Sequence, residues 1–174
     1  MAGRTSRLQQ EIRQTRPFRS VWHEAFLSVL KTADVFRRAV SGVLQPHGIT
    51  AQQYNVLRIL RGAEPEGLPT LAIAARLIEE TPGVTRLLDR LEARQLIRRT
   101  RCRKDRRQVL CRITPAGLRL LEQTGECILA PERNLERVWK ASEARALIAL
   151  MDRAREAMAE SPLPQNQPDQ RSNR

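Results

Sequence analysis

Residues Thr81 to Arg107 read TPGVTRLLDRLEARQLIRRTRCRKDRR, and this stretch decides the fold. In its first half, apolar side chains recur at helical spacing, at Val84, Leu87, Leu88 and Leu91. The opposite face is polar and basic, with Thr85, Arg86, Asp89, Arg90 and Arg94. Such a pattern predicts an amphipathic helix with one buried face and one solvent-facing face.

The residues just before this helix predict a tight turn and another, shorter helix. Thr81-Pro82 is typical of a helix start, because Thr can cap and Pro is tolerated at the first helical position. A short helix is expected from about Leu71 to Ile78, with a buried face at Leu71, Ala74 and Leu77. Two helices joined by a tight turn, the second basic on its outer face, indicate a helix-turn-helix.

After the amphipathic helix the apolar period changes from 3.6 to 2. Leu96-Ile97 precedes the charged run Arg98 to Arg107, and alternating residues Val109 to Ile113 follow it. This predicts two strands joined by a basic tip, which is a wing. Thr114-Pro115 then repeats the cap-and-proline signal for a further helix.

Upstream, two more helices are expected. Thr50 and Gln53 have the spacing of a capping box, which predicts a helix that buries Leu57 and Leu60. Before it, an apolar stripe continues over about 25 residues: Trp22, Phe26, Val29, Ala33, Phe36, Val40 and Val43. A stripe this long exceeds what a small domain needs, so part of it is expected to seat against a second subunit.

The two ends of the chain differ from the middle. Residues 1–17 are polar and basic and are expected to form a flexible arm. Residues 161–174 are rich in Pro, Gln and Asn and are expected to be a disordered tail. Between the wing and this tail, helices are expected over 115–160, the last burying an apolar face: Leu147, Leu150, Met151, Ala154 and Met158.

Charge is concentrated in the same decisive stretch. The formal net charge is +12, and Thr81 to Arg107 holds ten basic residues against three acidic ones. Of the 31 cations, 28 are Arg, whose planar fork suits phosphate oxygens and guanine edges. A polyanionic partner, double-stranded DNA, fits this pattern best.

Several other classes of protein are not supported by the sequence. No phosphate-binding glycine loop or GxSxG motif is present, so no enzyme is predicted. His23 and His47 lack nearby ligands at metal spacing, so neither a metal nor a cofactor is expected. No long apolar span or signal core is present, and three cysteines without CxxC spacing favour a reducing, cytoplasmic location.

The segment Ile73 to Gly117 resembles the DNA-binding core of the multiple antibiotic resistance regulator (MarR) family. VTRLLDRLE, at 84–92, is similar to the family's recognition helix. Asp105-Arg106-Arg107, Cys111, Ile113-Thr114 and Gly117 are similar to its wing pattern DRRxxxVxLTxxG. Two departures stand out, because Gln95 occupies a position that is usually Gly and Cys111 one that is usually Val.

The resemblance implies a mainly α fold with a small β-hairpin wing. A winged helix-turn-helix over 49–114 would lie between dimerisation helices at 18–48 and 115–160. It also implies a homodimer that binds a pseudo-palindromic operator, mostly as a repressor, and is released by a small molecule or an oxidant. An effector pocket is implied between the dimer helices and the winged domain, although no residue marks its chemistry.

The residues expected at the DNA belong to the start of the recognition helix and to the wing tip. In the helix they are Thr81, Pro82, Gly83, Thr85, Arg86 and Arg90, placed to meet phosphates and base edges in the major groove. In the wing they are Arg103, Asp105, Arg106 and Arg107. The resemblance implies that Asp105 braces the hairpin by pairing with an Arg, while Arg107 enters the minor groove.

Alternative hypotheses remain at this stage. The basic side chains of the helix could simply solvate a surface, and several between Arg98 and Lys104 could contact phosphates or nothing. Cys102 and Cys111 lie on the two wing strands, where arginines could lower a thiol pKa and create a redox switch. Cys127 offers a third thiol. A nonspecific nucleoid-type DNA-binding protein is the remaining hypothesis, and it predicts affinity indifferent to sequence.

Overall fold

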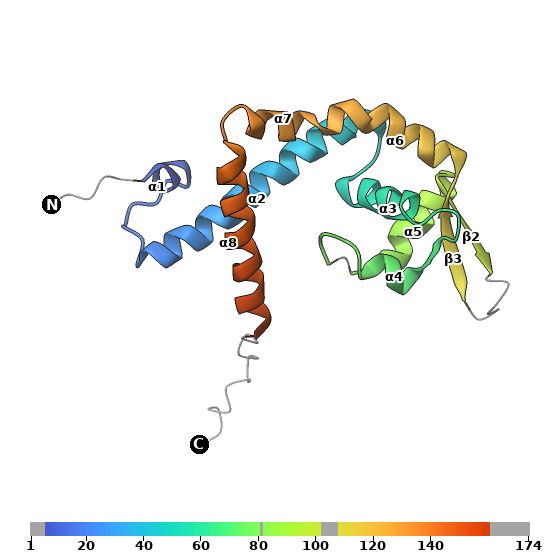
Figure 1. Cartoon of the computed structure of the whole chain (residues 1–174), viewed down its shortest axis with the longest axis horizontal. Coiled ribbons are helices and arrows are strands. Elements are labelled where there is room, and N and C mark those ends of the chain that lie inside the picture. Colours follow the sequence, from blue (N-terminus) through green and yellow to red (C-terminus); the bar gives the residue numbers. More distant parts are fainter. Residues whose placement is uncertain (1–5, 81, 102–107, 161–174) are drawn as a thin grey trace, which may run out of the picture. The chain divides into compact units, whose positions relative to one another are not determined.

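The computed structural model describes residues 6–80, 82–101 and 108–160, mostly as helices with one small sheet (Figure 1). The chain forms two compact units, residues 1–131 and 132–174. The elements in chain order are α1 (Arg7–Glu11), α2 (Val21–Leu44), the 3-10 helix η1 (Gln45–His47), α3 (Ala51–Arg61), β1 (Leu68–Pro69), α4 (Thr70–Ala74), α5 (Val84–Ala93), β2 (Ile97–Arg101), β3 (Val109–Ile113), α6 (Pro115–Ile128), α7 (Ala130–Glu136) and α8 (Ala141–Glu160).

The long first helix is present as α2, and its apolar stripe changes environment along its length. Trp22 and Phe26 near its start are 80% and 57% exposed, whereas Leu44 at its end is fully buried. The helix begins where the Ser20 hydroxyl accepts a hydrogen bond from the His23 amide at 3.2 Å. The C-terminal end of α2 therefore belongs to the core, and its N-terminal end does not.

The capping box that starts α3 is confirmed. The Thr50 hydroxyl accepts the Gln53 amide at 3.2 Å, and the Gln53 side chain accepts the Thr50 amide at 3.0 Å. This reciprocal pair satisfies two backbone donors that a helix start otherwise leaves free. The register of α3 is thereby set so that Leu57 and Leu60 point inward, both fully buried.

The wing belongs to a three-stranded antiparallel sheet in the order β1-β3-β2. The two predicted strands pair with Ile97 opposite Ile113 and Arg101 opposite Val109. The third strand, β1, was not predicted, and it pairs only Leu68 and Pro69 with the middle strand. Two residues are too few to show a period of 2, so no sequence pattern marks this strand.

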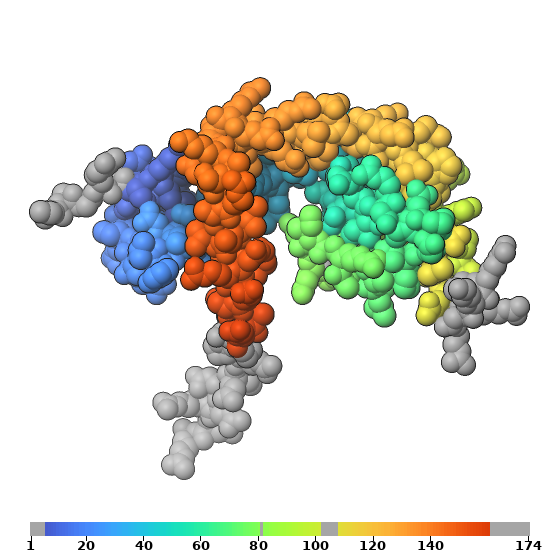
Figure 2. Space-filling model, viewed as in Figure 1, coloured from blue at the N-terminus to red at the C-terminus, as the bar shows by residue number. Residues whose placement is uncertain are grey.

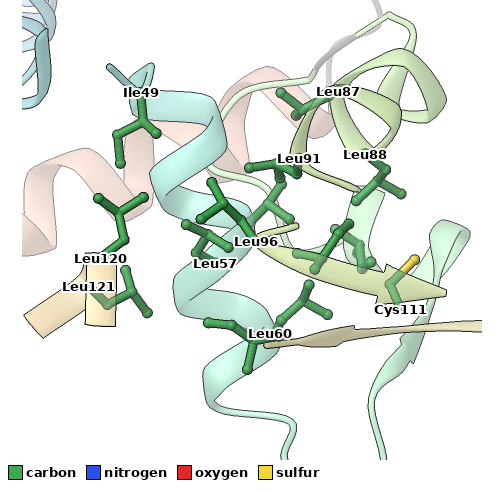
Figure 3. Packing of buried hydrophobic residues seen from close by; sticks show 14 of the residues in the cluster. Ile49, Leu57, Leu60, Leu87, Leu88, Leu91, Leu96, Cys111, Leu120 and Leu121 are labelled. Atoms are coloured by element: carbon green, nitrogen blue, oxygen red, sulfur yellow. The ribbon is translucent and has the colours of Figure 1, made fainter. Parts of the chain in front are cut away.

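The core lies between α3, α5, the sheet and the start of α6 (Figure 3). Leucines of α3 and α5 converge on the buried side of the strands, where Cys111 is also fully buried. These parts form one continuous body in Figure 2, coloured green and yellow. Its buried members are Leu44, Ile49, Val56, Leu57, Leu60, Ile73, Leu87, Leu88, Leu91, Leu96, Ile97, Cys111, Ile113, Leu120 and Leu121.

Helix α6 begins at the predicted cap and packs very closely on the sheet. The Thr114 hydroxyl accepts the Gly117 amide at 3.1 Å and donates to the Gln95 carbonyl at 2.7 Å. A Cβ atom at Gly117 would lie 2.7 Å from Ile113 Cγ1 and closer still to the Leu96 carbonyl oxygen. Gly117 is thus required by the close approach of the helix to the strand ends.

Three expectations about burial and order differ from the structure. Leu71 of α4 is 82% exposed and Ile73 is fully buried, so the predicted buried face was wrong at Leu71, whereas Leu77 is partly buried against the core. The segment expected to be a flexible arm contains α1, whose start is capped by Ser6. Helix α8 has no buried residue, so the face predicted from Leu147 to Met158 is not covered within the described part of the chain. The expected tail, 161–174, lies outside the described residues.

Candidate nucleic-acid interface

The recognition helix α5 begins two residues later than the sequence predicted. Its N-cap is Gly83, whose φ of 89° is in the left-handed region. Glycine adopts this conformation without the penalty that a Cβ imposes. Pro82 lies in the turn before the helix and not at its first position, so that prediction was wrong, and Thr81 lies outside the described residues.

The outer face of α5 is available to a ligand along its first two turns. Thr85, Arg86 and Arg90 are exposed, as are Pro82 and Gly83 in the preceding turn. Within the described parts of the chain, neither of these arginines forms an ion pair. The buried face holds the helix in place, with Leu88 and Leu91 fully enclosed. The helix therefore presents a basic, hydroxyl-bearing surface while its opposite face is packed into the core.

The exit from α5 explains what Gln95 does in place of glycine. The Leu96 amide donates to the Leu91 carbonyl at 3.0 Å, and the Gln95 amide donates to the Glu92 carbonyl at 2.7 Å. This is a Schellman motif, in which the residue after the cap adopts a left-handed conformation. Gln95 has φ 57°. The motif is formed without its preferred glycine, so the turn into β2 is preserved at the expense of some backbone strain.

The wing strands place their arginines on different surfaces. Arg98 and Arg101 are exposed, whereas the Arg99 side chain is only 23% exposed. Across the strands, Arg99 is paired with Cys111, so the partner of that cysteine in the register is an arginine. The wing-tip residues Cys102, Arg103, Asp105, Arg106 and Arg107 lie outside the described residues, and their assigned roles stay predictions.

Arg99 connects the wing to the recognition helix. Its Nη1 donates to Asp89 Oδ1 at 2.6 Å and lies 3.4 Å from Glu92 Oε2. Its Nη2 donates to the Thr85 carbonyl oxygen at 3.3 Å. The Arg99 backbone amide also donates to Glu92 Oε1, at 2.9 Å. We call Arg99, Asp89 and Glu92 the wing brace.

The brace was not found by sequence reasoning, which assigned the arginines of this run to phosphates or to no contact. Burial alone lowers the pKa of the Arg99 guanidinium, but hydrogen bonds to Asp89 and Cys111 and the charges of Asp89 and Glu92 raise it above its ordinary value. The side chain is therefore a permanent cation neutralised by protein carboxylates. Its only signal in the sequence is that it is the third residue of the first wing strand, too common a pattern to interpret.

The described cysteines differ in their suitability for redox chemistry. Cys111 is fully buried, and burial raises the pKa of its thiol against the opposing influence of Arg99. Arg99 does lower the pKa of the Cys111 thiol, as the sequence suggested, but burial outweighs it and the net shift is upward. Cys127 is exposed on α6.

Two other kinds of site are absent from the described residues. No cluster of His, Cys, Asp and Glu there could hold a metal ion. None of the described helices combines the length and the apolar character that crossing a membrane takes.

A separate cavity of about 330 Å³ lies between α2, α3 and the segment that leads to α5. Phe36, Val40, Leu77 and Ile78 make much of its wall apolar. At its rim, Arg37 Nη1 lies 3.9 Å from Glu79 Oε1. The Ile78 amide donates to Asn55 Oδ1 at 3.1 Å, which fixes the same segment to α3. The wall of the cavity thus includes residues only a few positions before the recognition helix.

Comparison with known proteins agrees with this geometry. The model of the MarR family matches residues 49–109. The chain is 41% identical over 90 residues to the HTH-type transcriptional regulator TtmR of Methylorubrum extorquens, over 52% of this chain. The matched segment spans only 45% of the length of TtmR.

Solved structures extend the likeness to most of the chain. The crystal structure of a MarR transcription factor from Planctomyces limnophilus is 40% identical, with a TM-score of 0.56, covering 78% of this chain and 98% of that one. The S. aureus MepR-DNA complex has a TM-score of 0.68 at 23% identity, covering 77% and 97%, which is a likeness of fold. The chain therefore belongs to the MarR family of winged-helix, DNA-binding transcriptional regulators.

Proposed function

We propose that this chain is a homodimeric repressor that binds a pseudo-palindromic operator and is released by a small molecule. The observation that carries the proposal is the outer face of α5, where Thr85, Arg86 and Arg90 are exposed while the opposite leucines are buried. A major groove about 12 Å wide admits one helix, and arginine forks suit its guanine edges. Helix α5 can therefore insert without any change in its packing.

The domain boundaries expected from the sequence give the division of labour in this proposal. Residues 49–114 would bind DNA, while 18–48 and 115–160 would join the two protomers. The exposed apolar side chains of α2 support the second role, because Trp22 and Phe26 are more than half exposed in the described chain. Helix α8 has exposed apolar residues too, including Ile148 at 59% and Leu150 at 55%. Exposed apolar faces of this kind are typical of interfaces between subunits.

DNA-bound MepR supports the mode of binding, since its fold is similar and its structure was solved as a complex with DNA. A two-fold symmetric dimer with one winged helix per protomer would meet two half-sites about one helical turn apart. The wing tips would add minor-groove and phosphate contacts through the predicted residues Arg103, Arg106 and Arg107, with Asp105 as their brace.

The apolar cavity beside α2 is the proposed site of the effector. Its volume of about 330 Å³ suits a small molecule, and its lining is mainly apolar with a few polar groups. Ile78 and Glu79 line it and precede the recognition helix. A ligand that binds one position of this segment better than another would shift α5 and lower the affinity for DNA.

Selection of binding sites from random DNA tests the proposal. A palindromic consensus with two half-sites, together with sedimentation of the free protein as a dimer, is the expected result. A protein that enriches no sequence would instead be a nonspecific nucleoid-type binder. A monomer at all concentrations would contradict the two-half-site arrangement. Apolar small molecules should then be screened for release of the selected duplex. The control is a Val40→Trp variant, whose larger side chain fills the cavity, so that an effector should no longer release the DNA.

A further inference from the structure

The wing brace joins two elements that must meet the same piece of DNA. Arg99 lies on β2, and besides its hydrogen bond to Cys111 on β3 its side chain contacts Thr85, Asp89 and Glu92 of α5. These three positions are spaced four and three residues apart, so they form one stripe along the helix. One guanidinium thus holds two turns of α5, which restrains both its position and its tilt relative to the strand.

We propose that Arg99 is a positioning residue for DNA binding, which sets the angle between the recognition helix and the wing without contacting DNA. This rests on the proposed function in one respect, that α5 and the wing bind one duplex. The Arg99 side chain is 23% exposed and is committed to two carboxylates. Arg98 and Arg101 on the same strand are exposed and remain available for phosphates.

Electrostatics make this role testable by the sign of an effect. Asp89 is 53% exposed and lies on the basic outer face of α5, where a carboxylate would repel DNA. If Asp89 acted only as a surface charge, its removal would strengthen binding. If it holds Arg99, and through Arg99 the wing, its removal weakens binding although a negative charge is lost.

The experiment measures affinity for a duplex that the wild-type protein selects from random DNA, over a series of salt concentrations. We expect Arg99→Met to weaken binding by about tenfold, the size expected when charge-assisted hydrogen bonds are lost. Methionine keeps the apolar stem of the side chain and removes its fork. The slope of log K against log salt should stay unchanged, because no phosphate contact is removed.

Asp89→Ala should also weaken binding, and the double variant should lose little more than either single variant, because both remove one interaction. The matched control is Arg98→Met, which removes the same charge from the neighbouring, exposed position of β2. We expect it to leave the brace intact and to reduce the salt slope or change little. Affinities are referred to the DNA-binding-competent fraction, determined by stoichiometric titration, so that a loss of folded protein does not imitate a loss of affinity.

Tighter binding by Asp89→Ala would overturn the proposal, and so would a loss in Arg99→Met no greater than that in Arg98→Met. Asp89 is half exposed, so its variant remains informative if Arg99→Met folds poorly. The selection step tests whether the protein recognises a sequence, while the comparison of variants tests the brace. The two proposals can therefore fail separately.

Discussion

The core around α5 and the N-terminal half of α2 contain similar apolar side chains in opposite environments. Leu88 and Leu91 are fully buried among elements of their own chain, whereas Trp22 is 80% exposed. Both helices have a regular apolar face, so periodicity alone does not distinguish them. The difference teaches that the part around α5 is stabilised by contacts within its own chain, while the exposed face of α2 is the one that the proposed dimer would cover.

The largest effect should come from a change in the buried core around α5. Leu88→Ala removes a fully buried side chain and is expected to lower the free energy of unfolding by about 2–5 kcal/mol, from lost burial and a residual cavity. Chemical denaturation measures this loss, which should be the same at every protein concentration if the core is complete in one protomer. A loss that depends on protein concentration would show that the core around Leu88 is not complete in one protomer.

Gly117→Ala tests how tightly the same region is packed. The added Cβ would meet the Leu96 carbonyl and Ile113, and the shift needed to relieve it should lower the free energy of unfolding by about 1–3 kcal/mol. Gly125 on the same helix has open space around its Cβ position. Gly125→Ala is therefore the control and should be neutral or stabilising.

Phe26→Ala tests the exposed N-terminal half of α2. We expect the dimer dissociation constant to rise by about tenfold, because an apolar contact at the proposed interface is lost. Sedimentation measures this change, and unfolding of the isolated protomer should be little affected. Val35 is 45% exposed but outside the stripe, so Val35→Ala should leave the dimer unchanged. Equal effects of the two variants would contradict the proposed interface.

The smallest effect concerns Gln95, in the turn that follows α5. Gln95 has φ 57°, a conformation that suits glycine, so Gln95→Gly should raise the free energy of unfolding by about 0.5–1 kcal/mol. A thermal melt detects this gain. Gln123→Gly, in the middle of α6, is the contrasting control and should destabilise the protein by about 1 kcal/mol. Destabilisation by both would show that the Gln95 side chain contributes more than its backbone strain costs.

Elements with a local cause could be predicted from the sequence. The capping box at Thr50 and the cap at Thr114 act within one turn, so adjacent residues determine them. The exposed face of α5 and the two wing strands follow from period. The inward face of α4 could not be predicted, because five residues cover little more than one helical turn and Leu71 and Ile73 are equally apolar.

The start of α5 and the role of Arg99 were missed for a different reason. Thr81-Pro82 is a sound helix start on local grounds, but Gly83 is the N-cap and the helix begins at Val84, two residues after the predicted first position. Arg99 has its partners on another element, ten and seven residues away. Those atoms come together only because β2 packs beside α5, and sequence spacing does not reveal that packing.

The strand order β1-β3-β2 leaves two sheet edges, which are places where a sheet can add strands from another molecule and aggregate. Edge β1 is two residues long and contains Pro69, which lacks an amide donor. Edge β2 has its Arg99 amide occupied by Glu92, and Arg98 and Arg101 add like charges that repel a second copy. The exposed arginines that the proposal makes available to a polyanion would therefore also guard the protein against fibril-like self-association.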